Sequence, residues 1–160
     1  MYEEIIVPLD MSSTSEIALP HAIAVARAFG SRVTLLFANE PLTVLPEPTI
    51  GGPMITVLPE PEDELDAAKE YLEKKVGDLT IQGVSARMEI LEGSPAYEIG
   101  QYIKDHSVDL IVMTTHGRTG LLKFMYGSVA SSLLQEITIP ILLVRVCGDE
   151  KCPAPQGGGS

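Results

Sequence analysis

The chain has 160 residues, of which 45% are hydrophobic and 5% aromatic, and its 22 acidic and 11 basic residues give a formal charge of -11. Nucleic acid and anionic membranes repel such a charge, so we exclude both as partners, and no apolar run approaches the roughly 20 residues of a membrane span. The aliphatic composition is typical of α/β proteins and the N-terminus resembles no signal peptide, so we expect one cytoplasmic domain over residues 1–146.

The first predicted elements are a strand over Glu3–Leu9, EEIIVPL, and a helix after it. The hydroxyls of Ser12–Thr14 are suitable N-caps, and Gly30 is a typical helix stop. Pro20 lies inside the helical pattern and removes a backbone hydrogen bond. We therefore expect a kink at this proline, or a helix that starts later than the caps suggest.

A second strand is predicted over Arg32–Ala38, and the segment that follows it is unusual. Glu40–Pro61 holds six of the 12 prolines and many apolar residues without stable periodicity. A segment of this length without secondary structure is either mobile or functional. The sequence leaves open whether this insert covers a pocket, extends a dimer interface or stays disordered.

Helical and strand patterns then alternate to the end of the domain. They predict a helix over Asp63–Val76, a strand over Val84–Leu91, a helix capped by Ser94 with Pro95 at its first position, a strand over Asp109–Met113, a helix over Gly127–Glu136 and a strand over Ile141–Val146. Strands that alternate with single helices predict an α/β, Rossmann-like fold with helices on both faces of a parallel sheet. We expect five strands in the order 3-2-1-4-5.

In such sheets ligands bind beyond the carboxyl ends of the strands where the strand order reverses, here between the first and fourth strands. Two segments meet there: VPLD, which ends at Asp10, and MTTHGRTGLLKFMYGSVA, which is Met113–Ala130. Gly117 and Gly127 let backbone N–H groups approach a phosphate, and the helix that begins at Gly127-Ser128 favours negative charge. Asp10 suits a ribose hydroxyl, so the residues favour a nucleotide.

Each of these features also has a purely structural interpretation. The glycines can serve the turn alone, and Ser128 can be only an N-cap. His116 can be a surface residue, and Arg118 and Lys123 can be solvated loop cations. The chain contains no G-x-x-x-x-G-K-[ST], and no G-x-G-x-x-G follows the first strand, so we exclude a P-loop nucleotidase and do not expect a dinucleotide cofactor.

The tail over residues 147–160 holds the two cysteines, Cys147 and Cys152, and ends in the linker-like GGGS. A Cys-x4-Cys pair can close a small disulfide or supply half of a metal site, but two thiols do not complete a structural zinc site. We favour two thiols in a reducing compartment, on a disordered tail.

Four segments together resemble the universal stress protein family: VPLDMSSTSEIAL, EGSPAYEI, DLIVMTTHGRTGLLKFMYGSVASSLL and IPILLVR. The resemblance covers residues 1–146, with the insert in the family's variable region. ATP-binding members of this family carry the motif G-2x-G-9x-G-(S/T). Gly117 matches the second glycine, nine residues follow it, and Gly127-Ser128 complete the motif. Thr114 stands in place of the first glycine, which is the main departure from the family pattern.

The resemblance implies the adenine nucleotide alpha hydrolase-like version of the Rossmann fold and an ATP site. Asp10 would bind the ribose, Pro8 and Leu9 would line the pocket, and Ala38 would lie beside the adenine. The remaining residues expected around the ligand are Met113, Thr114, His116, Gly117, Arg118, Gly127, Ser128 and Val129. The resemblance also implies a homodimer through Ile141–Val146, and we expect any Mg²⁺ or Mn²⁺ to be held by the phosphates.

The expected function is that of an ATP-binding regulatory dimer in the stress response. Hydrolysis needs a water-positioning base and a metal near the γ-phosphate, and the loop offers only His116 as a base. A slow ATPase therefore remains an alternative. A nucleotide-free scaffold that acts through its dimer surface is a second alternative, and Thr114 supports it.

Overall fold

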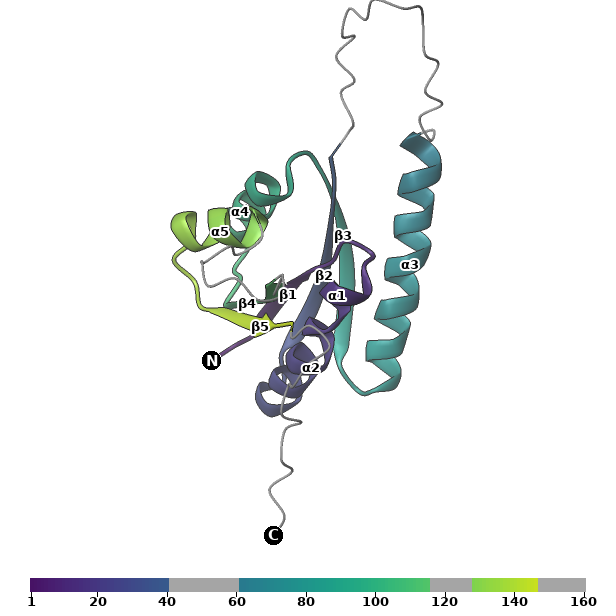
Figure 1. The fold of residues 1–160 in the computed structure, drawn as a ribbon. Coiled ribbons are helices and arrows are strands. Elements are labelled where there is room, and N and C mark those ends of the chain that lie inside the picture. Colours follow the sequence, from purple (N-terminus) through teal and green to yellow (C-terminus); the bar gives the residue numbers. More distant parts are fainter. Residues whose placement is uncertain (41–60, 116–127, 147–160) are drawn as a thin grey trace, which may run out of the picture.

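The computed structural model describes residues 1–40, 61–115 and 128–146 (Figure 1). Their helices and strands are β1 (Glu4–Pro8), α1 (Ser13–Glu16), α2 (Ala18–Phe29), β2 (Arg32–Asn39), α3 (Pro61–Ile81), β3 (Ser85–Glu92), α4 (Pro95–Asp105), β4 (Leu110–Thr115), α5 (Ser128–Glu136) and β5 (Ile141–Arg145). The expectations for the insert over residues 41–60 and for the cysteine-bearing tail lie outside the described residues.

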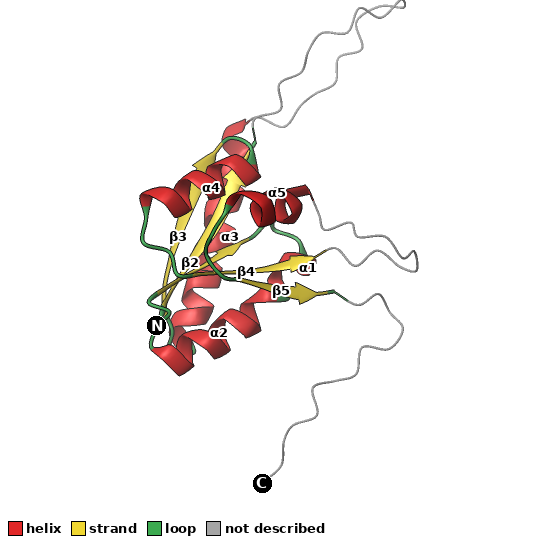
Figure 2. Cartoon of the chain, turned by 90° about the vertical axis from the view of Figure 1, so that its left-hand side faces the viewer, coloured by secondary structure: helices red, strands yellow, loops and turns green. Residues whose placement is uncertain are grey.

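The sheet formed by the described segments has five parallel strands in the order β3-β2-β1-β4-β5, which confirms the predicted fold class and strand order. Helices α4 and α5 lie together on one face of the sheet, and α1, α2 and α3 lie on the other (Figures 1 and 2). None of the helices in these segments is long and apolar enough to cross a membrane.

The first predicted helix is divided into two just before Pro20, where we expected a kink or a later start of the helix. The one-turn helix α1 ends at Glu16, and α2 starts at Ala18 with Pro20 at its third position. Because proline has no N–H and its ring crowds the carbonyl four residues earlier, a continuous helix would leave the Glu16 carbonyl without a partner. At the other end of α2, Gly30 adopts φ 70°, the left-handed conformation of a typical helix stop.

Helix α3 is longer than the sequence predicted. We expected it to end near Val76, but it continues through Gly77 to Ile81. Ala68, Leu72 and Leu79 lie on its inner face and are 0%, 0% and 1% exposed. Burial of a further leucine on the same face outweighs the low helix propensity of one glycine, about 1 kcal/mol, so the helix does not stop there.

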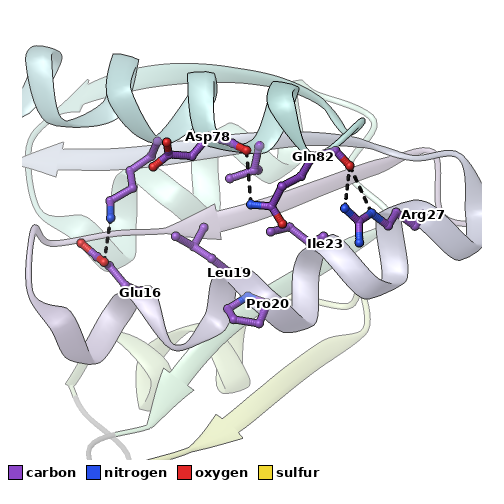
Figure 3. A pocket seen from close by; sticks show the side chains of 9 residues that line it. Glu16, Leu19, Pro20, Ile23, Arg27, Asp78 and Gln82 are labelled. Carbon is purple, nitrogen blue, oxygen red and sulfur yellow. Dashed lines mark hydrogen bonds and ion pairs between the residues drawn. The ribbon is translucent and has the colours of Figure 1, made fainter.

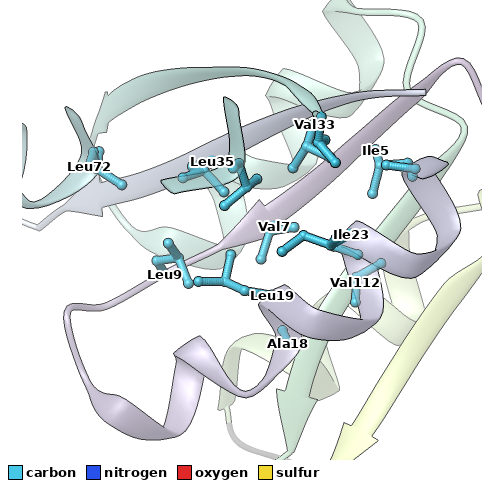
Figure 4. Close-up of a cluster of buried hydrophobic side chains, with 14 of the residues drawn as sticks. Ile5, Val7, Leu9, Ala18, Leu19, Ile23, Val33, Leu35, Leu72 and Val112 are labelled. Atoms are coloured by element: carbon cyan, nitrogen blue, oxygen red, sulfur yellow. The ribbon is translucent and has the colours of Figure 1, made fainter. Parts of the chain in front are cut away.

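The sheet separates two hydrophobic cores because successive strand residues point to opposite faces. Ile5 and Val7 of β1 pack with Val33 and Leu35 of β2 against α2 and α3 (Figure 4). Leu36 belongs to the second core, under α4 and α5. Both faces of the central strands are therefore buried, which explains their continuous apolar runs.

A polar network joins β1, β2 and β3 to α4 on the second face, in the amino-terminal half of the strands. Thr34 donates a hydrogen bond to the Glu4 carboxylate. Arg87 Nε donates to Thr34 Oγ1 at 2.8 Å, and an Arg87 amino group lies 3.2 Å from both Glu4 Oε1 and the Tyr102 hydroxyl. Glu4 and Thr34 are buried, but each has hydrogen-bonding partners. Because these polar groups bond to one another, the network leaves no space for a ligand in this half of the sheet. We therefore expect a ligand site at the carboxyl ends of the strands.

Candidate functional site

A cavity of about 460 Å³ opens at the carboxyl ends of the strands, where β1 and β4 lie side by side and their connections diverge. Its walls come from the ends of β1, β2 and β4 and from the first turns of α4 and α5. It is lined by Pro8, Leu9, Asp10, Ser15, Leu36, Ala38, Pro95, Ile99, Met113, Thr114, Ser128, Val129 and Ala130. The cavity therefore lies in the crevice where the strand order led us to expect a ligand.

Eight of the residues that the sequence singled out line this one cavity. They are Pro8, Leu9, Asp10, Ala38, Met113, Thr114, Ser128 and Val129. The other four, His116, Gly117, Arg118 and Gly127, lie outside the described residues, as does Lys123. The structure thus brings together residues from three distant parts of the sequence.

Five lining residues were not predicted. They are Ser15, Leu36, Pro95, Ile99 and Ala130. Leu36 precedes Ala38 by two positions, so strand periodicity places both on the same face of β2. Pro95 and Ile99 begin the helix that follows β3, one turn apart. Knowledge of the strand order alone would not reveal that α4 reaches over β1 and β2 to the cavity.

Part of the cavity wall consists of buried apolar side chains. Leu9, Leu36, Ile99 and Met113 are buried. The backbone N–H of Leu9 donates to the Leu36 carbonyl at 2.8 Å, which extends the pairing of β1 with β2 beyond Pro8. A flat aromatic ring would find an apolar slot here, with the backbone of β2 at its edge.

Asp10 lies at the rim in a hydrogen-bonded turn. Its Oδ1 accepts the Ser12 N–H at 3.0 Å and the Ser12 hydroxyl at 2.5 Å. Its own N–H lies 3.4 Å from Ser15 Oγ. Although Asp10 is exposed, the surrounding protein displaces some water and so opposes its ionisation. The hydrogen bonds from Ser12 and Ser15 outweigh this effect and hold the pKa of Asp10 below its usual value, so the carboxylate is an acceptor at neutral pH.

The same turn is anchored to α3 through Glu16. The Tyr71 hydroxyl donates to Glu16 Oε1 at 2.9 Å, and Lys75 Nζ lies 2.7 Å from Glu16 Oε2. Lys75 lowers the pKa of Glu16, while burial and the neighbouring Glu16 carboxylate raise the pKa of Tyr71. This anchor therefore connects the rim of the cavity to α3.

The lining also includes hydroxyl groups and the start of α5. Thr114 ends β4 there, and Ser128 is the first residue of α5. The free backbone N–H groups and the positive dipole end of a helix favour an anion. Within the described part of the lining Asp10 is the one carboxylate, and these segments hold no cluster of three or more His, Cys, Asp or Glu side chains suited to a metal ion.

A second cavity, of about 400 Å³, lies between α2 and α3 (Figure 3). Three of its charged groups have partners: Lys75 pairs with Glu16, and the Arg27 guanidinium donates to the Gln82 carbonyl at 2.6 and 3.2 Å. It runs along two helices, away from the strand ends. The cavity at the carboxyl ends of the strands is the better candidate for a ligand. Its lining includes the Asp10 carboxylate, which can accept further hydrogen bonds, and the start of α5.

Comparison with known proteins identifies relatives along the whole domain. The model of the universal stress protein family matches residues 1–145. The universal stress protein MJ0531 of Methanocaldococcus jannaschii is 34% identical over 146 residues, which are 91% of this chain and 83% of that protein. The solved structure of MJ0577, from the same organism, matches with a TM-score of 0.71 and 30% identity over 93% of this chain and 99% of that one.

A universal stress protein from Archaeoglobus fulgidus, solved in complex with dAMP, shares the fold at a lower identity. Its TM-score is 0.63 and its identity 21%, over 89% of this chain and 97% of that chain.

Proposed function

The chain belongs to the universal stress protein family, and we propose that it binds ATP or another adenine nucleotide in the cavity at the carboxyl ends of β1 and β4. The observation that carries this proposal is the composition of the cavity. Buried apolar side chains, one ionised carboxylate and one helix start line a common space, and these are the groups that a base, a ribose and a phosphate need. The Archaeoglobus fulgidus protein, which has the same fold, holds dAMP.

In this proposal the base lies in the apolar slot between Leu36, Ile99 and Met113, and the backbone at Ala38 reads its edge. Asp10 accepts a hydrogen bond from the ribose. The phosphates extend toward Thr114 and Ser128, where hydroxyls and the first amides of α5 donate to them. His116, Gly117, Arg118 and Gly127 would complete the phosphate end, as the family motif implies.

Thr114 in place of the first motif glycine does not close the site. The residue lines the cavity, so its hydroxyl is available as a donor to a phosphate oxygen. Compared with glycine, a threonine at this position leaves less space for the phosphates, but its hydroxyl can donate one hydrogen bond to them. We propose that this exchange is compatible with nucleotide binding, against the alternative of a nucleotide-free scaffold.

We favour a regulatory role over catalysis. A Mg²⁺ or Mn²⁺ ion would be held mainly by the phosphates, because Asp10 is the one carboxylate in the described lining and lies at the ribose end. Hydrolysis would depend on His116, so a slow ATPase is the second candidate. We propose that nucleotide occupancy changes the state of a homodimer.

The test is calorimetric titration of nucleotide-stripped protein with ATP. We expect saturable binding with one site per chain. Ala38→Phe should weaken it by roughly tenfold or more, because a ring in the slot occupies the space of the base. Ala28→Phe, an equal enlargement on the exposed side of α2, is the matched control and should leave affinity unchanged. Absence of binding at millimolar ATP would favour the scaffold.

A further inference from the structure

Ser12 makes two hydrogen bonds through one hydroxyl group, and their directions are determined by chemistry. Its Oγ accepts the backbone N–H of Ser15 at 3.1 Å. A backbone N–H can only donate, so the single hydroxyl hydrogen of Ser12 remains available for its other partner. That partner is Asp10 Oδ1 at 2.5 Å, a carboxylate oxygen that can only accept. The hydroxyl of Ser12 therefore points at Asp10.

This arrangement divides the two oxygens of the Asp10 carboxylate. Oδ1 receives two donors from Ser12, the hydroxyl and the backbone N–H at 3.0 Å. The other oxygen, Oδ2, receives neither of the Ser12 donors and can accept a donor from the cavity. The two hydrogen bonds to Oδ1 also fix the orientation of the carboxylate, because rotation about the Cβ–Cγ bond would break both of them. Asp10 thus presents one acceptor in one direction.

The geometry assigns Ser12 as a positioning residue that makes the site selective for a ribose hydroxyl, an inference that rests on the proposed nucleotide site. A fixed carboxylate accepts a hydroxyl hydrogen without loss of its own rotational freedom, and the resulting bond is charge-assisted. A deoxyribose that lacks this hydroxyl leaves the acceptor without its donor. Ser12 does not touch the nucleotide in this arrangement. It acts through Asp10.

Helix capping alone does not explain the hydroxyl of Ser12. The N-cap serine of α4, Ser94, makes no side-chain hydrogen bond to its helix, and α4 nevertheless forms over 11 residues. At α1, by contrast, the capped helix is only four residues long. The hydroxyl of Ser12 thus connects a very short helix to the carboxylate at the cavity rim.

The experiment compares the dissociation constants of ATP, 2′-deoxyATP and 3′-deoxyATP by calorimetry. Wild-type protein should prefer ATP by about three- to tenfold over the analogue that lacks the contacted hydroxyl. Ser12→Ala should weaken ATP binding and leave binding of that analogue almost unchanged, so the preference falls below about twofold. Ser12→Thr keeps the hydroxyl and should keep the preference. Ser13→Ala, at the exposed neighbouring position, is the control and should also keep it.

A second variant separates positioning from capping. Ser12→Asp is a good N-cap but supplies no donor to Asp10, so it should retain α1 and still lose the ribose preference. A preference retained in Ser12→Asp, or an equal loss of affinity for ATP and both analogues in Ser12→Ala, would overturn the inference. If wild-type protein binds ATP and both analogues equally, the inference fails and the proposed function stands. If it binds none of them, both fail.

A readout without nucleotide gives an independent check. The pKa of the Asp10 carboxyl, followed by carbon NMR in the free protein, should rise in Ser12→Ala because one donor to the ionised form is lost. An unchanged pKa in a folded Ser12→Ala protein would contradict the positioning role.

Discussion

Met11, between Asp10 and Ser12, has a backbone conformation that its side chain does not favour. Its φ is 61°, in the left-handed region, where it is the one non-glycine residue of the described segments. This conformation turns the chain so that the Asp10 carboxylate reaches the Ser12 N–H two residues later. The strain at Met11 therefore accompanies the geometry on which the proposed ribose contact depends.

We predict that Met11→Gly leaves stability unchanged or raises it by up to about 1 kcal/mol, because glycine removes a left-handed penalty of about 1–2 kcal/mol and adds a smaller entropic cost. Met11→Val should lower the free energy of unfolding by about 1–2 kcal/mol, since β-branching is disfavoured there. Urea denaturation of the three proteins tests this. A valine variant as stable as the glycine variant would show that the strain is absent.

Thr114 stands where the ATP-binding motif of the family has its first glycine. At this position the sequence alone allowed two outcomes: a strand end that crowds the ligand or one that contributes a hydroxyl. The structure places Thr114 in the lining of the same cavity as Asp10, at the end of β4. We propose that Thr114 contributes its hydroxyl to the phosphate contact.

At the scale of elements, the short helix α1 connects the cavity rim to α3. Ser12 at its N-cap bonds to Asp10, and Glu16 at its last position bonds to Tyr71 and Lys75. Local propensity does not account for a helix of four residues, because nucleation is costly and one turn gains few hydrogen bonds. Its two anchors stabilise it instead.

We predict that Glu16→Gln lowers stability by about 0.5–1 kcal/mol at pH 7, the range for a partly exposed ion pair. The folded-state pKa of Glu16 lies below its usual 4.5. Its contribution is therefore full above about pH 4.5 and is lost as the pH falls through the lower, folded-state value. Urea denaturation at pH 7 and pH 3 should show a smaller difference from wild type at pH 3 than at pH 7.

Glu73→Gln, on the exposed face of α3, is the matched control for this pH dependence. It should resemble wild type at both pH values. A Glu16→Gln difference of equal size at pH 3 and pH 7 would show that the side chain contributes through packing and not through its charge.

At the scale of the whole molecule, the two edges of the sheet differ. β3 forms one edge, and α3 packs closely against it. β5 forms the other edge, and its residues Ile141, Leu142 and Leu143 are only half-buried. An apolar edge strand with unpaired backbone groups favours pairing with another strand. We propose that a second copy of the chain pairs here, as the family resemblance implied.

Light scattering after size exclusion should then give twice the mass of one chain. Leu143→Lys places a charge in the middle of β5 and should shift the protein to the monomer at micromolar concentration. Leu134→Lys, on an exposed position of α5, is the control and should leave the dimer intact. A Leu143→Lys variant that is folded by circular dichroism and still dimeric would place the interface elsewhere.

The sequence by itself determined the types of the elements, their order, the parallel sheet and the general place of the cavity. These follow from local signals: apolar periodicity, the caps at Ser12 and Gly30, the break at Pro20, and the right-handed rule for crossovers. The same signals located Asp10 and Ser128 at the ends of elements that meet at one edge of the sheet, and the family resemblance supplied the other six predicted lining residues.

Only the tertiary structure decided the features that depend on contacts between distant segments. Burial of Leu79 against the sheet set the length of α3, which local propensity at Gly77 would have shortened. The approach of α4 placed Pro95 and Ile99 in the cavity wall. The direction of the Ser12 hydroxyl depends on two partners held at fixed distances, because a hydroxyl rotates freely until its neighbours determine where its hydrogen points.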